Sequence, residues 1–60
     1  MTENEFNAKY TKLSLQAAAF KNELQSAGLN DHRKVRILLQ AAENLRRFRA
    51  LLLERINELS

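Results

Sequence analysis

The stretch LQSAGLND, residues 24–31, interrupts a chain of 60 residues that otherwise favours helix throughout. It contains Gly28, the only glycine, and the chain has no proline. A glycine directly after the last apolar residue of a helix adopts the left-handed conformation that ends the helix, and Asn30 or Asp31 can then cap the next one. The sequence therefore predicts two helices joined by a tight turn at residues 28–30.

The segment before the turn has a helix start signal and a regular apolar face. Thr2 and Glu5 form a capping box, in which the Thr2 hydroxyl accepts a hydrogen bond from the Glu5 amide and the Glu5 carboxylate accepts one from the Thr2 amide. Apolar residues then recur at alternating intervals of four and three, the spacing of a coiled-coil seam. The seam residues are Phe6, Tyr10, Leu13, Ala17, Phe20, Leu24 and Ala27. This pattern predicts a helix over about residues 3–27.

The segment after the turn repeats the same spacing without a glycine or proline to interrupt it. Arg49 occupies one of its seam positions, and the others are Val35, Leu38, Ala42, Leu45, Leu52, Ile56 and Leu59. This pattern predicts a second helix over about residues 31–59. Two helices of similar length joined by a short turn favour an antiparallel hairpin.

The two seams can be set against each other in one register. The register that places Ala27 beside Val35 sets large side chains opposite small ones. It pairs Leu24 with Leu38, Phe20 with Ala42, Ala17 with Leu45, Leu13 with Arg49, Tyr10 with Leu52 and Phe6 with Ile56. The predicted fold class is all-α, and residues 1–60 form a single domain, an antiparallel, coiled-coil-like two-helix hairpin.

The second helix carries more apolar residues than one partner helix can cover. A chain this short builds little core of its own, so we expect the surplus to bind another helix. The residues predicted to bind a partner are Leu15, Ile37, Leu39, Ala41, Phe48, Leu51 and Leu53. A two-fold homodimer that forms a four-helix bundle is the simplest arrangement that covers them. The alternative is that they are scattered exposed apolar residues of no significance, which are common on protein surfaces.

Arg49 is the one charge at the centre of the predicted seam. Its stem can pack while its guanidinium reaches the surface of the bundle. It can instead select one register, because a polar group at a seam position disfavours competing alignments. Direct recognition of a ligand is a third interpretation.

Basic residues gather on the second helix, and the chain carries a formal net charge of +3. The residues that could contact phosphates are Arg33, Lys34, Arg36, Arg46 and Arg47. No aromatic residue lies among them to stack on a base, and Glu43 interrupts the strip, so a solvated face with internal ion pairs is the competing interpretation. A nucleic-acid partner stays open, because binding to phosphates would weaken steeply with salt.

Several functional classes are disfavoured by composition. The chain has no cysteine and a single histidine, His32, which excludes a disulfide framework and a zinc cage and leaves no catalytic constellation. We therefore expect no enzymatic activity, no metal, no cofactor and no small-molecule substrate. The acidic N-terminal residues and the short apolar runs predict neither a secretory signal nor a membrane segment, and so a cytoplasmic protein.

The predicted architecture resembles that of the Rop-type RNA-binding hairpin dimers, and equally that of the helical-hairpin co-chaperones of bacterial type III secretion. Both resemblances lie in hairpin geometry and assign no functional residue to this chain. The sequence thus predicts a non-enzymatic protein–protein interaction module, an adaptor, chaperone or regulator, which pairs with itself or with helices of another protein. The alternative is a small hairpin dimer that regulates by binding RNA or DNA through the basic strip.

Overall fold

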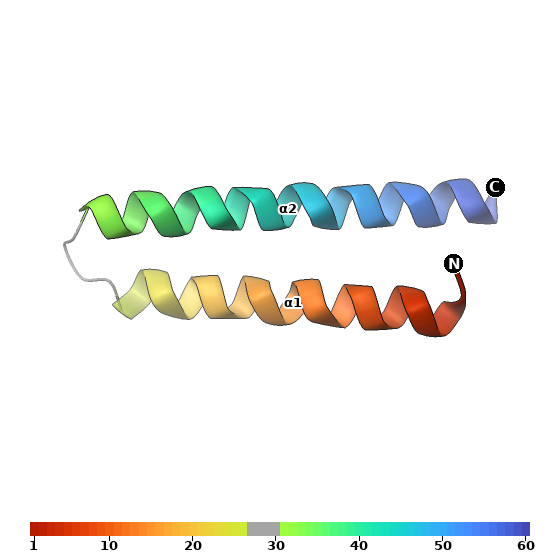
Figure 1. The fold of residues 1–60 in the computed structure, drawn as a ribbon, viewed down its shortest axis with the longest axis horizontal. Coiled ribbons are helices and arrows are strands. Elements are labelled where there is room, and N and C mark those ends of the chain that lie inside the picture. Colours follow the sequence, from red (N-terminus) through yellow and green to blue (C-terminus); the bar gives the residue numbers. More distant parts are fainter. Residues whose placement is uncertain (27–30) are drawn as a thin grey trace.

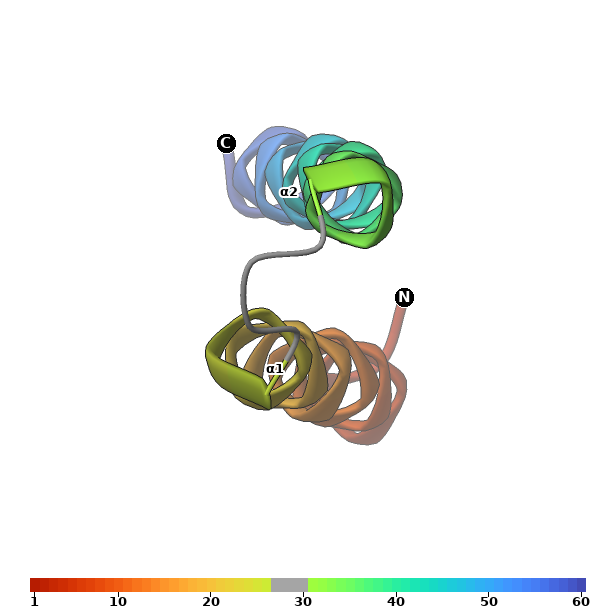
Figure 2. The same ribbon diagram turned by 90° about the vertical axis from the view of Figure 1, so that its left-hand side faces the viewer.

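Two helices run antiparallel in a computed structural model, which describes residues 1–26 and 31–60, the Asp31 side chain excepted. Helix α1 spans Glu3–Ser26 and helix α2 spans Asp31–Leu59. They lie side by side in both views, with the two chain ends together at one end of a molecule that measures 45 × 16 × 10 Å (Figures 1 and 2). The predicted all-helical hairpin is confirmed.

The predicted start of α1 is confirmed, and of the two hydrogen bonds of the predicted capping box the structure shows the one accepted by Thr2 and not the one accepted by the Glu5 carboxylate. The Glu5 amide donates to the Thr2 hydroxyl at 3.1 Å, and the Phe6 amide donates to the Thr2 carbonyl at 3.0 Å. The Thr2 side chain therefore satisfies one of the amides that the first turn of a helix leaves without a partner. The predicted glycine stop at Gly28 and the predicted cap, at Asn30 or at the Asp31 side chain, lie outside what the structure describes.

The face that α2 turns toward α1 differs from the predicted one. Ile37 and Leu51 are buried, with 4% and 6% of their surfaces exposed, whereas the predicted seam residues Leu38 and Leu45 are 54% and 66% exposed. We call the packed surface between the helices the hairpin interface. Its α2 residues are Ile37, Ala41, Asn44, Phe48, Leu51 and Arg55, and its α1 residues are Phe6, Tyr10, Leu13, Ala17, Phe20 and Leu24. The predicted α1 seam is thus correct from Phe6 to Leu24, its last residue Ala27 lies outside the described residues, and the predicted α2 seam is wrong.

The correction amounts to a rotation of α2 about its own axis. The observed α2 residues of the hairpin interface also follow alternating intervals of four and three. Each of them immediately precedes a residue of the predicted seam in the sequence, as Ile37 precedes Leu38. A shift of one position turns a helix by about 100°. Tyr10, which was predicted to face Leu52, instead meets the Phe48 ring edge-on at 5.0 Å and 89°.

A buried amide helps to select this face of α2. Asn44 is 4% exposed, and its Nδ2 donates to the Leu13 carbonyl at 3.2 Å and to Gln16 Oε1 at 3.3 Å. The predicted register placed Arg49 opposite Leu13, and Asn44 takes that place instead. A buried amide needs such partners, so the α2 face that contains Asn44 fits only where α1 supplies them.

The chain ends are tied together by a polar cluster of Met1, Glu3, Arg55 and Glu58. The Met1 ammonium lies 2.9 Å from Glu58 Oε1, and Arg55 donates to the Met1 carbonyl at 3.0 Å and pairs with Glu3 and Glu58. The Arg55 guanidinium also lies over the Phe6 ring, 5.5 Å from its centroid. Arg55 is a charged residue in an otherwise largely apolar hairpin interface, and its ion pairs and hydrogen bond satisfy that charge. These contacts fix the relative position of the helices at this end.

Candidate protein-interaction face

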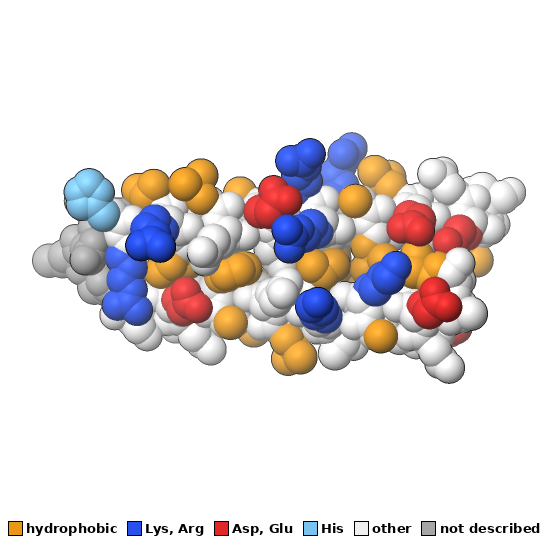
Figure 3. Space-filling view, in the orientation of Figure 1, with side chains coloured by type: hydrophobic (Ala, Val, Ile, Leu, Met, Phe, Trp, Pro, Cys, Tyr) orange, Lys and Arg blue, Asp and Glu red, His pale blue; other side chains and the backbone are white. Residues whose placement is uncertain are grey.

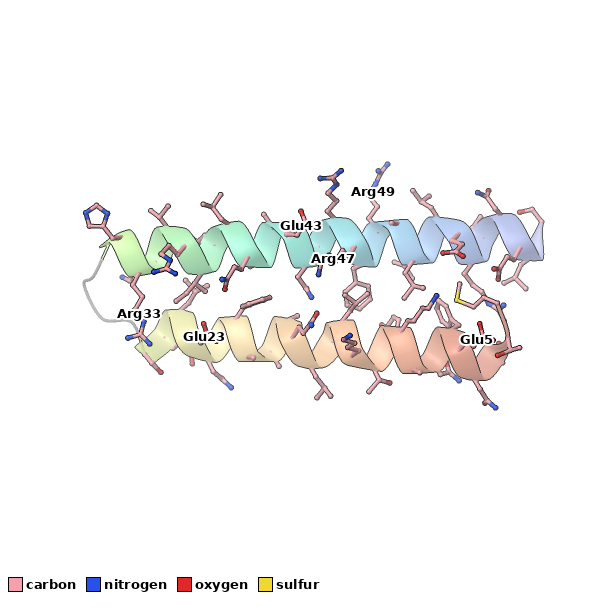
Figure 4. The ribbon with its side chains drawn as sticks, in the orientation of Figure 1. Glu5, Glu23, Arg33, Glu43, Arg47 and Arg49 are labelled. Carbon is pink, nitrogen blue, oxygen red and sulfur yellow. The ribbon has the colours of Figure 1, made fainter. Side chains whose placement is uncertain are left out.

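The predicted seam of α2 forms an exposed apolar surface, turned by about 100° from the side of α2 that packs on α1. We call it the outer face. Its residues, including the two leucines that border the seam, are Val35, Leu38, Leu39, Ala42, Leu45, Leu52, Leu53, Ile56 and Leu59, with Arg49 at its centre. The large apolar side chains among them are 41–73% exposed. Figure 4 shows Arg49 on the side of α2 away from α1.

Four of the seven predicted partner-binding residues belong instead to the hairpin interface. Ile37 and Leu51 are buried, and Ala41 and Phe48 are half-buried. The expectation that these four side chains are exposed is wrong, because the rotation of α2 carries them against α1. The exposed apolar residues of α2 are instead mainly those of the predicted seam.

The other three predicted partner-binding residues are exposed. Leu39 and Leu53, at 66% and 44%, border the outer face, as expected for residues beside its spacing. Leu15, at 67%, is separated from the outer face. It lies two positions from Leu13, so it is turned by about 200° on α1 and points away from α2.

An apolar groove adjoins the outer face. It has a volume of 330 Å³, and Leu45 belongs both to the groove and to the outer face. The groove is lined from α1 by Ala17, Phe20, Lys21, Leu24 and Gln25, and from α2 by Ala41, Asn44 and Leu45. The apolar surface available to a partner helix therefore extends from α2 toward α1.

Basic side chains line grooves on another face of the hairpin. Arg33 and Arg36 line a groove of 470 Å³ together with Glu23, and Figure 4 shows Arg33 reaching from α2 toward Glu23 of α1. Arg47 lines a second groove, of 300 Å³, with Lys9 and Lys12 of α1. Lys and Arg side chains spread over both helices on this face, with acidic groups between them (Figure 3).

The basic strip predicted on α2 is therefore only partly correct as one surface. Lys34 is half-buried, whereas Arg33, Arg36, Arg46 and Arg47 are exposed. Lys9 and Lys12 were missed, because the basic residues were grouped along one helix and not across the hairpin.

Glu43 neutralises part of the basic charge. Its carboxylate lies 3.8 Å from Arg46 Nη1 and 3.5 Å from Arg47 Nε, both across exposed turns of α2. Exposed pairs at these spacings stabilise a helix only slightly. Their larger effect here is to lower the positive potential in the middle of the basic surface.

The titratable groups do not form a reaction centre in the described part of the chain. No three His, Cys, Asp or Glu side chains of residues 1–26 and 32–60 lie close enough together to hold a metal ion. The pKa of the Glu58 carboxyl is lowered from its ordinary value of 4.5, first by its hydrogen bond with the Met1 ammonium, and Arg55 adds to the effect. This shift belongs to the structural cluster at the chain ends.

Within the described ranges, neither helix combines the length and the hydropathy needed to cross a membrane. No family model, curated protein or solved structure matches the chain. Function must therefore be inferred from the surfaces of the molecule itself.

Proposed function

We propose that this chain is a non-enzymatic protein–protein interaction module that acts through the outer face of α2. The observation that carries the proposal is the coiled-coil spacing of exposed apolar residues from Val35 to Leu59, interrupted only by Arg49. Such spacing is the pattern by which helices pack on one another. The partner is a second copy, which gives a four-helix bundle, or a helix of another protein.

The small core of the hairpin supports this proposal. Ile37 and Leu51 are the only apolar side chains classed as buried in the described residues. Full burial of one large aliphatic side chain contributes about 1.5–3 kcal/mol, and chains below roughly 70–80 residues usually need an additional source of stability. Burial of the outer face in a complex would supply it.

A matched pair of substitutions tests the proposal. Leu38→Glu places a charge on the outer face, and Leu15→Glu places the same charge on the far side of α1, where the leucine is similarly exposed. Leu38→Glu should abolish association of the chain, measured by sedimentation equilibrium and by cross-linking to partners in an extract of its host. Leu15→Glu should leave association unchanged, and circular dichroism checks that both variants stay helical.

Equal effects of the two substitutions would contradict the proposal. Undiminished association of Leu38→Glu would also contradict it, because burial of a glutamate carboxylate without a counter-charge is strongly unfavourable.

The second candidate function is a hairpin dimer that binds RNA or DNA. The observation that favours it is the shared groove of Lys9, Lys12 and Arg47, which places positive charge on both helices of one face. Lys12→Gln together with Arg47→Gln should then remove most affinity for structured RNA or duplex DNA and lower the dependence of affinity on salt. Arg49→Gln is the matched control, because Arg49 lies on the outer face.

We rank this function second because acidic groups interrupt the basic surface. Glu43 pairs with Arg46 and Arg47, and Glu54 lines the groove of Lys9 and Lys12. Failure of the parent chain to bind nucleic acid in low salt would remove the candidate.

A further inference from the structure

We infer that the outer face binds the outer face of a second copy, with the two α2 helices antiparallel and centred on each other near residue 47. This inference rests on the proposed function and names its partner. It specifies which residues meet across the two-fold axis, and so it can fail while the interaction module stands.

The first argument is that the outer face is complementary to its own reversed copy. Its spacing is symmetrical about residue 47, so reversal of the helix direction sets each seam position opposite another. Val35 meets Leu59 of the partner subunit, Leu38 meets the partner's Ile56, Ala42 meets the partner's Leu52, and Leu45 meets the partner's Arg49. A large side chain faces the small Ala42 in its layer, which helps to fill the seam.

The second argument comes from the leucines beside the seam. Leu39 and Leu53 are exposed and belong to no contact within the predicted or the observed hairpin interface. Both lie on the same flank of the outer face, seven residues on either side of Arg46. In the antiparallel register, Leu39 lies beside the partner's Leu53, and the pair recurs on the other side of the axis. The same register thus covers the seam and its flank.

The third argument excludes a parallel pair. Two α2 helices in parallel and in register would set Arg49 directly against the partner's Arg49 inside the seam. Burial of two like charges in contact is strongly unfavourable. The antiparallel pair sets each Arg49 against Leu45 of the partner subunit, where its stem packs and its guanidinium reaches solvent.

The outer face is large enough for a stable dimer. It extends from Val35 to Leu59, about 36 Å along the helix. A standard interface removes about 800 Å² from each partner, roughly a sixth of the 4883 Å² that the hairpin exposes. A helix face of this length, together with the adjoining groove, supplies such an area.

The arrangement has one electrostatic cost, which makes it testable. Arg46 and Arg49 of both copies gather at the axis, and Glu43, 3.8 Å from Arg46, offsets only part of their charge. Added salt screens this repulsion, so it should strengthen the dimer. Arg49→Glu should also strengthen the dimer, on the order of fivefold in Kd, because it places a carboxylate near the partner's Arg46.

Cysteine cross-linking tests the register. Because the chain has no native cysteine, any disulfide must form between the introduced residues. An equimolar mixture of Leu38→Cys and Ile56→Cys chains should form a disulfide-linked dimer under mild oxidation, since a disulfide requires Cβ atoms within about 4.5 Å. Each variant oxidised alone should stay mostly uncross-linked, and Leu15→Cys should behave in the same way. Sedimentation equilibrium of the unmodified chain is measured alongside.

The outcomes separate this inference from the proposed function. A dimer in which Leu38→Cys alone cross-links efficiently would overturn the antiparallel register and leave the interaction module intact. A chain that stays monomeric, but whose outer face captures a foreign helix more weakly after Arg49→Glu, would overturn the second copy as partner and favour an acidic one. A monomer that captures nothing through this face would overturn both.

Discussion

Asn44 determines more of the architecture than any single apolar residue of α2. It is the only buried polar residue in the part of the chain that the structure describes, and both acceptors of its hydrogen bonds lie on α1. A buried polar group with partners at one place disfavours other alignments, in which the amide would lose them. Asn44 therefore explains why α2 presents the face with fewer apolar residues to α1.

We predict that Asn44→Ala lowers the free energy of unfolding by about 1–3 kcal/mol, because it removes two hydrogen bonds and the side chain that fills the layer. The matched control is Gln40→Ala, which truncates an exposed amide one turn earlier and should change stability by less than about 0.5 kcal/mol. Urea denaturation followed by circular dichroism measures both. Equal losses would show that Asn44 has no special role in the interface.

The Glu58 carboxylate gives the molecule a defined response to acid. Its pKa is lowered by the hydrogen bond with the Met1 ammonium, so the folded state favours the charged form. The resulting stabilisation is fully present above the ordinary pKa of 4.5 and is lost as the pH falls through the lower pKa of the folded state.

We therefore predict that acetylation of the Met1 α-amino group raises the Glu58 pKa toward 4.5. NMR titration of the side-chain carboxyl carbon measures this pKa. Acetylation should also reduce the loss of stability on acidification below this pH. In Glu58→Gln the acetyl group should have no such effect on the acid response. An unchanged Glu58 pKa after acetylation would show that the ammonium contact does not form in solution.

At the scale of the helices, the cap of α1 is the contribution that can be measured most directly. The Thr2 hydroxyl accepts a hydrogen bond of 3.1 Å from the Glu5 amide, and this bond is exposed to solvent. We predict that Thr2→Ala costs about 1 kcal/mol of stability. Thr11→Ala is the control, since Thr11 lies in the middle of α1, where alanine is the better helix former and should be neutral or slightly stabilising. Thermal unfolding of the two variants should shift in opposite directions or by clearly different amounts.

The sequence was sufficient to predict the helices and insufficient to orient one of them. Both bounds of α2 and the start of α1 follow from capping, spacing and the position of Gly28. Helix α2, however, carries two interleaved coiled-coil spacings that differ by one position, and the one with more leucines was placed against α1. The other contains Asn44 and Arg55, whose partners lie on α1 and at the chain end. Those partners become visible only once the helices are paired.

The exposure and the grouping of the candidate site residues could also be predicted only in part. Leu39 and Leu53 were assigned correctly as exposed because they lie outside both spacings. Lys9 and Lys12 were missed because their proximity to Arg47 depends on how the two helices align. The periodicity of a helix identifies its apolar faces, whereas the face that packs on the neighbouring helix, and any surface that two helices share, depends on how the helices pair.

For the whole molecule, the distribution of surface separates the two candidate functions. The outer face is apolar apart from Arg49 at its centre, whereas the groove of Lys9, Lys12 and Arg47 lies on another face. We expect association through the first surface to strengthen, and nucleic-acid binding through the second to weaken, as ionic strength rises. A titration with salt can therefore test both functions on the same sample.

We predict that self-association strengthens as salt is raised. The Debye length falls from roughly 30 Å at 0.01 M to 3 Å at 1 M, so the repulsion among the arginines of paired outer faces is screened while apolar burial persists. Sedimentation equilibrium of the 7.0 kDa chain at fixed protein concentration should show a growing dimer fraction across this range. Thermal stability should rise with protein concentration as well, because association stabilises the folded state by mass action.

Affinity for duplex RNA, if any is found in low salt, should instead fall steeply over the same range, since each phosphate contact releases counterions. A dimer that dissociates as salt increases would show that opposite charges, and not the apolar outer face, hold the copies together.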